Sequence, residues 1–302
     1  MSDTLGIEIC SSFFRAVSLS DTGEIKGSDS KPIEILEPRL DQLIEFVKSL
    51  TARWERPAAV GIAVPGLVDS AQKLIYSAHI PEHADADLGA AIESVAGVRP
   101  ILENDANAAA FGEYTLGAGG GSHSMFYVTL GEGVGGALII DGEIWRGAGG
   151  FAGEFGSVPI NSEGTRLEEV ASSLNIIRRT RSRFHQDSTS ALNSLNEDAI
   201  TLAAIIDAAG KDDDFAKMML KRTGAYVGSA VATVINLLNV EKIVIGGEIM
   251  EAKQVVLDAV IERAHEFSFR GSFDTTSIVE GTLGQNAAAI GAALLAQNSL
   301  KT

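Results

Sequence analysis

The chain has 302 residues, of which 45% are hydrophobic and 21% charged, and its formal net charge is −16 at pH 7. This length accommodates two domains of ordinary size. The acidic balance argues against nucleic acid as a partner, because phosphate backbones are bound by clustered Lys and Arg. Cys10 is the only cysteine, which excludes an intramolecular disulfide and a cysteine-rich zinc site. There is no signal peptide and no apolar run of about 18 residues, so we expect a cytoplasmic protein without a membrane span.

The N-terminal part of the chain reads as strands followed by helices. Apolar residues at 5–9 and 13–19 indicate two strands, and those between 40 and 50 recur at helical spacing. A strand over 58–64 is ended by Pro65-Gly66. The elements predicted next are a helix around 88–97, a short strand at 99–102 and a helix over 107–113.

The five residues 117–121, four of them glycines, indicate a domain boundary, and beyond them the pattern repeats. Strands are predicted at 124–130 and 136–140, with Asp141-Gly142 as a hairpin turn to a third strand. Residues 180–198 are polar and predict a mobile connection. The elements predicted after it are a helix over 224–239, a strand at 242–249 and a small-residue helix at 287–297 suited to close packing. Strands followed by helices, twice over, predict two similar α/β halves.

The glycines at 131–136 match the spacing G-x-G-x-x-G. A dinucleotide-binding fingerprint needs a helix directly after it, but ALIIDGEIW reads as a hairpin. Two interpretations stay open: a turn whose backbone N–H groups approach a phosphate, and a tight structural turn. No G-x-x-x-x-G-K-[ST] motif occurs, which excludes a P-loop.

Several carboxylates lie where a strand or loop leads into a helix. Asp105 follows a strand and precedes a helix, a position used both for helix capping and for function; taken alone, capping is the commoner role. The neighbouring Asn104 adds an amide that can bind a hydroxyl. Glu154 lies on a glycine-rich loop, and Glu168 and Glu169 open the following helix, where a solvated helix start is the commoner explanation for each alone.

Seven segments in order resemble the ROK family of bacterial sugar kinases and sugar-responsive repressors. They are GIAVPG, ENDANAAAFGE, TLGEGVGG, DGEIWRGAGGFAGEFG, LEEVASS, IVIGGEI and the final AAAIGAA.

The resemblance implies a two-lobed, actin-like (ribonuclease H-like) α/β ATPase fold with a central cleft. It places an N-terminal lobe at 1–117, a C-terminal lobe at 118–285, and a last helix, 286–302, packed back on the N-terminal lobe. It also implies phosphorylation of a hexose or N-acetylhexosamine with ATP and Mg²⁺, a small-molecule sugar as partner, and a homodimer.

Carried over residue by residue, the resemblance makes Asp105 the general base that accepts the proton of the attacking sugar hydroxyl. Positions matching sugar-binding sites are Pro65, Gly66, His79, Asn104, Glu154, Ser157 and Glu168. Positions matching the nucleotide side are Glu8, Ser11, Ser12, Gly131, Glu132, Gly133, Gly246 and Gly247, with Glu8 as a candidate Mg²⁺ ligand.

The sequence departs from the family pattern on both sides. The first phosphate loop, D-x-G-G-T in the family, reads Glu8-Ile9-Cys10-Ser11-Ser12 here, and Glu132 replaces a threonine of the second. A carboxylate about 4 Å from a phosphate oxygen is repelled by roughly 4 kcal/mol at an effective dielectric of ~20. On the sugar side Ser157 replaces a histidine and His79 a common asparagine. The family's zinc loop is replaced by the cysteine-free NSEGTRLEE, so no zinc is expected.

Two hypotheses remain for function. The first is an ATP-dependent sugar kinase with an unusual nucleotide site. The second is a catalytically degenerate sugar-binding protein of kinase fold, a sensor or regulatory partner with impaired ATP binding. We place the kinase first, because a general base with no reaction to serve would be free to drift. A DNA-binding repressor is not expected, since the kinase-like pattern begins at Gly6 and leaves no room for a helix-turn-helix.

Overall fold

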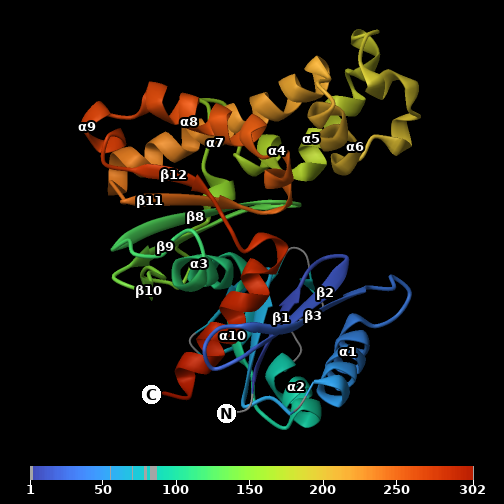
Figure 1. The fold of residues 1–302 in the computed structure, drawn as a ribbon, viewed down its shortest axis with the longest axis vertical. Coiled ribbons are helices and arrows are strands. Elements are labelled where there is room, and N and C mark those ends of the chain that lie inside the picture. The colour runs from blue at the N-terminus through green and yellow to red at the C-terminus, as the bar shows by residue number, and fades with distance from the viewer. Residues whose placement is uncertain (1–2, 55, 70, 78–79, 82–86, 302) are drawn as a thin grey trace. The chain divides into compact units, whose positions relative to one another are not determined.

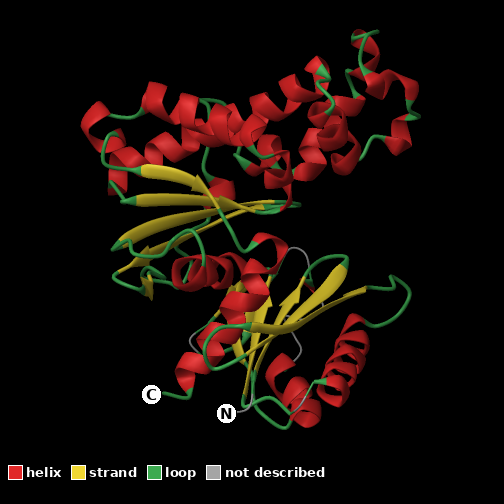
Figure 2. Ribbon diagram, in the orientation of Figure 1, coloured by secondary structure: helices red, strands yellow, loops and turns green. Residues whose placement is uncertain are grey.

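The computed structural model describes residues 3–54, 56–69, 71–77, 80–81 and 87–301. The chain divides into two compact units (Figure 1). The first contains Met1–Gly121, Glu143–Ala152 and Gln285–Thr302, and the second contains Ser122–Gly142 and Gly153–Gly284. Each unit is built around a mixed β-sheet covered by helices (Figure 2).

The sheet of the first unit has the strand order β3-β2-β1-β4-β7. β1 (Thr4–Ile9), β2 (Phe13–Leu19) and β3 (Ile25–Pro32) form an antiparallel meander, and β4 (Ala59–Val64) and β7 (Ile101–Asn104) continue it in parallel. The remaining elements of this unit are β5 (Leu67–Val68), β6 (Leu74–Tyr76), β10 (Glu143–Ile144), α1 (Arg39–Arg53), α2 (Leu88–Ala96), α3 (Asp105–Leu116) and α10 (Ala287–Ser299). The 3-10 helix η7 (Gly284–Asn286) begins with the last residue of the second unit and leads directly into α10.

Alternation along β1 gives the first sheet two different faces. Leu5, Ile7 and Ile9 belong to one hydrophobic core with the apolar residues of α1 and α2. Gly6, between them, lies on the opposite face, where α10 crosses the sheet. The same helix also packs along α3.

Glycines set how closely α10 approaches its neighbours. A Cβ atom on Gly6 would lie 1.9 Å from the carbonyl oxygen of Ala289, and one on Gly61 of β4 would lie 1.9 Å from that of Ala292. On α10 itself, a Cβ atom on Gly291 would lie 1.6 Å from the carbonyl oxygen of Ala108 in α3. Backbone therefore contacts backbone directly, which explains the predicted small-residue helix.

The second unit has an equivalent sheet in which β9 (Val134–Ile140) is antiparallel to β8 (Ser124–Leu130), and β11 (Lys242–Gly246) and β12 (Ser277–Glu280) continue in parallel. Its helices are α4 (Glu168–Ala171), α5 (Ser173–Arg181), α6 (Leu202–Gly210), α7 (Asp214–Leu238), α8 (Gln254–Phe267) and α9 (Arg270–Phe273). Its 3-10 helices are η2 (Phe155–Ser157), η3 (Phe184–Gln186), η4 (Ala191–Ser194), η5 (Glu197–Ala199) and η6 (Glu248–Ala252). The prediction of two similar α/β halves is confirmed.

The glycine cluster at 131–136 leads into β9 rather than a helix, which confirms the hairpin prediction. Asp141 and Gly142 both have positive φ, as the predicted tight turn requires. Residues 180–198 differ from the expectation of a loose connection. They include three 3-10 turns, and the side chains of Phe184 and Leu192 are buried in the core of the second unit. Phe184 and Leu192 are too far apart in the sequence to form a helical or strand-like hydrophobic pattern, so nothing in the sequence indicated that this segment is packed.

Among the described residues, no helix combines the length and apolar character needed to cross a membrane.

Replacing Gly291 by Ala tests the contact between α10 and α3. The added methyl would meet the backbone of Ala108, so we expect a loss of about 1–3 kcal/mol in the free energy of unfolding, the usual cost of overpacking. Gly210→Ala is the matched control, because a Cβ atom at this end of α6 meets nothing within 4 Å. Thermal and urea unfolding measure both variants. Equal stability of the two variants would contradict the described packing.

Candidate functional site

The first cluster of predicted site residues lies where β4 and β7 end. The two strands are parallel and in register, with Val64 opposite Asn104, so the chain leaves both at the same edge of the sheet. Gly66 follows β4 with a positive φ of 154°, and a Cβ atom there would lie 2.2 Å from the carbonyl oxygen of Tyr76. The turn therefore requires glycine. The side-chain amide of Asn104 donates a hydrogen bond of 3.0 Å to the carbonyl of Gly66.

Asn104 is also the N-cap of α3. Its side-chain oxygen accepts a hydrogen bond of 3.0 Å from the backbone N–H of Asn107. Capping, the commoner role for Asp105 when it is taken alone, belongs to the preceding residue. Asp105 is the first residue of the helix itself, in the first turn.

The carboxylate of Asp105 is half-buried and held in place locally. Its Oδ1 accepts a hydrogen bond of 2.9 Å from the N–H of Ala106 and another of 3.0 Å from the amide of Asn104. The helix N-terminus is a favourable place for a negative charge, because the first N–H groups point toward it. Asp105, Asn104 and the Pro65-Gly66 turn therefore form one cluster.

A buried carboxylate supports this cluster from behind. Oε1 of Glu103 accepts hydrogen bonds of 3.0 Å from the backbone N–H of Asn104 and from the amide of Asn107. Oε2 of Glu103 forms an ion pair with Arg146, in the segment after β10. Sequence reasoning missed both Glu103 and Arg146. A carboxylate inside a short apolar strand was the available signal for Glu103, since such a group is buried only when paired.

The predicted first phosphate loop is the β1–β2 hairpin turn. Glu8 and Arg15 are directly opposite in the strand register, and Arg15 Nη1 donates to Glu8 Oε2 at 2.8 Å. Arg15 also donates to the side-chain oxygen of Gln285 at 2.9 Å, next to the start of α10. Burial raises the pKa of Glu8, and Arg15 acts in the opposite direction.

Cys10 links this hairpin to Asp105 electrostatically. Burial is the main cause that raises the pKa of its thiol, and the negative charges of Glu8 and Asp105 add to it. The thiol therefore stays protonated at neutral pH. The turn itself is held by bonds to its backbone: the carbonyl of Ser11 accepts from Arg39 at 3.0 Å, and that of Ser12 accepts from the N–H of Ile33 at 2.9 Å. Arg15 and Arg39 are two cations at this turn that sequence reasoning missed.

Glu8 does not fit the role of a protein ligand for Mg²⁺ in this arrangement. Its carboxylate is paired with Arg15 at 2.8 Å, which offsets the negative charge that a Mg²⁺ ion held by one or two carboxylates and the substrate phosphates would need. We therefore assign no step of a reaction to a protein-held magnesium ion.

In the second unit, the two predicted nucleotide-side turns lie against each other. Gly131–Gly133 connects β8 to β9. Gly246 is the last residue of β11, which runs parallel to β8, and Gly247 follows it. Gly247 has a φ of 93°, and a Cβ atom there would lie 2.3 Å from the carbonyl oxygen of Leu130. Only glycine allows this approach. The carbonyl of Gly131 accepts a hydrogen bond of 2.8 Å from the N–H of Ser173.

Both of these turns carry a carboxylate. Glu132 is exposed at the tip of the β8–β9 turn, and Glu248 follows Gly247. Burial raises the pKa of Glu248, and the negative charge of Glu132 adds to this increase, whereas a hydrogen bond with Ser173 lowers it. Glu248 is a second acidic residue that sequence reasoning missed, and its proximity to Glu132 became visible only when β8 and β11 were paired.

Glu154, Ser157 and Glu168 form a further cluster in the second unit. Oε2 of Glu168 accepts a hydrogen bond of 2.9 Å from the N–H of Val134 at the start of β9. Burial raises the pKa of Glu154, and the charge of Glu168 contributes to it. Ser157 ends η2 and is exposed, and its N–H donates to the carbonyl of Glu154 at 3.1 Å. His79, also predicted to bind sugar, lies outside the described residues.

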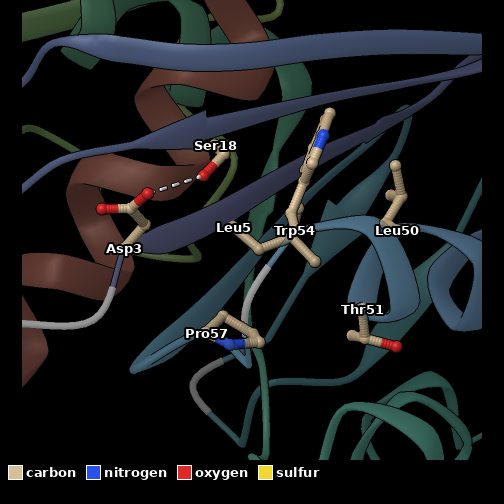
Figure 3. A pocket seen from close by; sticks show the side chains of 7 residues that line it. All are labelled: Asp3, Leu5, Ser18, Leu50, Thr51, Trp54 and Pro57. Carbon is tan, nitrogen blue, oxygen red and sulfur yellow. Dashed lines mark hydrogen bonds between the residues drawn. The ribbon is translucent and has the colours of Figure 1, made fainter.

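A small hollow in the first unit is not a candidate for a sugar site. It has a volume of about 10 Å³, room for roughly one water molecule. The residues that line it are Asp3, Leu5, Ser18, Leu50, Thr51, Trp54 and Pro57 (Figure 3). The Ser18 hydroxyl donates a long hydrogen bond of 3.4 Å to Asp3.

Comparison with known proteins shows the family. The model of the ROK family matches residues 4–299. The chain is 33% identical over 243 residues to a glucokinase of Halalkalibacterium halodurans, covering 77% of this chain and 74% of the relative. It is 25% identical over 296 residues to the xylose repressor of Bacillus subtilis, covering 95% of this chain and 75% of the repressor.

The fold matches a solved structure over nearly its full length. A ROK family glucokinase from Streptomyces griseus, in complex with glucose and AMPPNP, superposes with a TM-score of 0.89 at 26% identity, covering 98% of this chain and 100% of that one. The expected actin-like α/β fold is confirmed, and glucokinase-named relatives support a sugar kinase function. The chain belongs to the ROK family.

Proposed function

We propose that this protein transfers the γ-phosphoryl group of ATP to a hydroxyl of a hexose or an N-acetylhexosamine, with Asp105 as general base. The observation that carries the proposal is that Asn104 and Asp105 have different roles at the start of α3. Asn104 is the N-cap of α3, whereas Asp105 is the first residue of the helix and its Oδ1 is held by the N–H of Ala106 and the amide of Asn104. Relatives named glucokinase and the fold of a glucokinase bound to glucose and AMPPNP support the same reaction class.

In this mechanism Asp105 accepts the proton of the attacking hydroxyl as its oxygen bonds to the γ-phosphorus, while the bond from that phosphorus to the bridging oxygen breaks and ADP leaves. The hydrogen bonds from Ala106 and Asn104 to Oδ1 fix the orientation of the carboxylate before the sugar binds. Asn104, Gly66, Glu154 and Glu168 are proposed partners of sugar hydroxyls, because each hydroxyl must be paired once it leaves water. Protein dipoles that are already oriented need no reorganisation during the reaction.

A second function, a sugar-binding protein without phosphoryl transfer, is favoured by one observation: Glu132 and Glu248 interact electrostatically at the turns expected to face the nucleotide. Two carboxylates there would repel a polyphosphate.

The experiment that separates the two functions is ADP release with glucose, mannose, N-acetylglucosamine and N-acetylmannosamine, paired with calorimetric titration of ATP and Mg²⁺. Turnover with any of these sugars supports the kinase. No turnover, together with no ATP binding at millimolar concentrations, would exclude it.

Asp105→Asn is expected to reduce kcat by about 10²–10⁴-fold, the usual contribution of a general base, because an amide cannot accept the hydroxyl proton. Sugar affinity measured by calorimetry should stay within a few-fold, since the role is in the transition state. The matched control is Asp214→Asn, which removes an exposed carboxylate from the first turn of α7. If Asp105→Asn instead lost sugar binding and turnover in proportion, Asp105 would be a binding group and not the base.

Glu132→Thr and Glu248→Gln are each expected to tighten ATP binding by at least about tenfold, or roughly 1.4 kcal/mol, because each removes a negative charge near the proposed polyphosphate site. Glu262→Gln on α8 is a charge-matched control with no expected effect. Isothermal titration of ATP measures all three. Unchanged or weaker ATP binding in Glu132→Thr and Glu248→Gln would show that these side chains lie away from the phosphates.

A further inference from the structure

One face of α7 carries a row of polar side chains that the proposed function does not use. Arg222, Tyr226 and Ser229 are spaced by four and three residues, so they lie on the same side of the helix. Arg263 comes from α8, which packs along α7 (Figure 1). Asn161, from the loop after η2, completes the polar lining of a hollow of about 340 Å³. This volume is within the range of about 300–1,000 Å³ typical of small-molecule pockets.

Two arginines line the hollow, and a third lies near the ring of Tyr226, another lining residue. The guanidinium carbons of Arg179 and Arg222 lie 5.5 and 5.8 Å from the centre of the Tyr226 ring, and Arg222 Nε donates to the Tyr226 hydroxyl at 3.0 Å. Among the described residues, neither Arg179 nor Arg222 forms an ion pair with a carboxylate. Arg263 has one such partner, Glu266, at 3.0 Å. Of these three arginines, only Arg263 has a carboxylate partner among the described residues, although the net charge of the protein is −16.

Arg179 is the least satisfied member of this set. Its Nη2 donates to Thr223 at 2.7 Å and its Nε to the carbonyl of Asn175 at 3.3 Å. Its Nη1 is buried and has no hydrogen-bond partner among the described residues. Burial lowers the pKa of Arg179, Tyr226 acts in the opposite direction, and the positive charge of Arg222 adds to the decrease. Arg179 does not line the hollow, but its guanidinium carbon lies 5.5 Å from the ring centre of Tyr226, which does. Its positive charge therefore adds to the attraction that an anion near Tyr226 would feel.

We propose that this hollow, lined by Arg222, Arg263, Tyr226, Ser229 and Asn161, binds a phosphomonoester carried by a polyhydroxylated small molecule. The planar guanidinium groups of Arg222 and Arg263 suit the oxygens of a phosphate dianion. The Tyr226 hydroxyl accepts from Arg222 and can still donate to a neutral hydroxyl. The Ser229 hydroxyl donates to the carbonyl of Ala225 at 3.0 Å, so it can only accept a further hydrogen bond. The Asn161 amide is bonded to Thr165 through both of its atoms and keeps one N–H and one lone pair for a ligand hydroxyl. None of these residues belongs to the proposed sugar or nucleotide site, so the binding can be tested whether or not the protein is a kinase.

The test is calorimetric titration of the full chain, at low ionic strength, with three probes: inorganic phosphate, glucose 6-phosphate and glucose. The variant Arg222→Gln/Arg263→Gln removes both lining guanidinium groups. The control Lys221→Gln/Arg270→Gln removes the same charge from exposed positions on α7 and α9 outside the hollow. We expect glucose 6-phosphate to bind the native chain and the control equally, and the lining variant at least about tenfold more weakly.

Ser229→Glu, which places a carboxylate inside the hollow, should abolish the same binding and serves if the double variant does not fold. Tighter binding of glucose 6-phosphate than of inorganic phosphate supports a phosphorylated sugar. Equal binding of the two identifies a site for free phosphate and overturns the polyhydroxyl part of the proposal. Binding of glucose 6-phosphate that the lining variants leave unchanged overturns the site. Loss of a dimer in the lining variants by sedimentation, without any phosphate binding to the native chain, identifies the hollow as an interface between copies and also overturns it.

Discussion

The side chain of Asn104 is the contact on which the first cluster depends. Its oxygen caps α3, and its nitrogen bonds to both Gly66 and Asp105. One amide therefore fixes a helix terminus, a glycine turn and the orientation of the proposed base. An aspartate could not replace Asn104, because only an amide group carries both an acceptor oxygen and a nitrogen with two donor hydrogens. The buried Glu103 then holds Asn104 from its backbone side, so the geometry at the end of β7 is set by two residues before the base is reached.

The packing of α10 connects this cluster to the far end of the chain. Because Gly6 and Gly61 carry no side chain, α10 lies directly on β1 and β4, the strands that lead to the first hairpin turn and to Gly66. Arg15 bonds both to Glu8 on β1 and to Gln285 before α10. A change in the position of α10 would therefore reach the hairpin turn through an ion pair and through backbone contact. The small residues of the last helix are thus a constraint on the site as well as on stability.

The sequence was sufficient for the fold because its signals were local: hairpin turns at Asp141-Gly142, helical spacing between 40 and 50, and seven family segments in order. It was also sufficient to locate Asp105 next to a strand end. It could not assign the cap, because Asn104 and Asp105 are both good capping residues and only the hydrogen bonds separate them. The sequence also could not predict two pairs of charged side chains, Glu8 with Arg15 and Glu132 with Glu248. Each pair is brought together by the pairing of two strands, and the register of that pairing is known only from the structure.

The two altered phosphate turns differ in kind. In the first, glycines are lost, but the negative charge of Glu8 is matched by Arg15, and Arg39 adds a second cation. In the second, the glycines that permit a close approach remain, but Glu132 and Glu248 bring two negative charges. If both turns face phosphates, as proposed, the first would obstruct a phosphate by shape and the second by charge. A charge can be offset by a counterion carried with the nucleotide, whereas side chains in a tight turn have to move. Within the proposed nucleotide site, the hairpin of Cys10 and Ser11 would therefore oppose ATP more than Glu132 and Glu248 would.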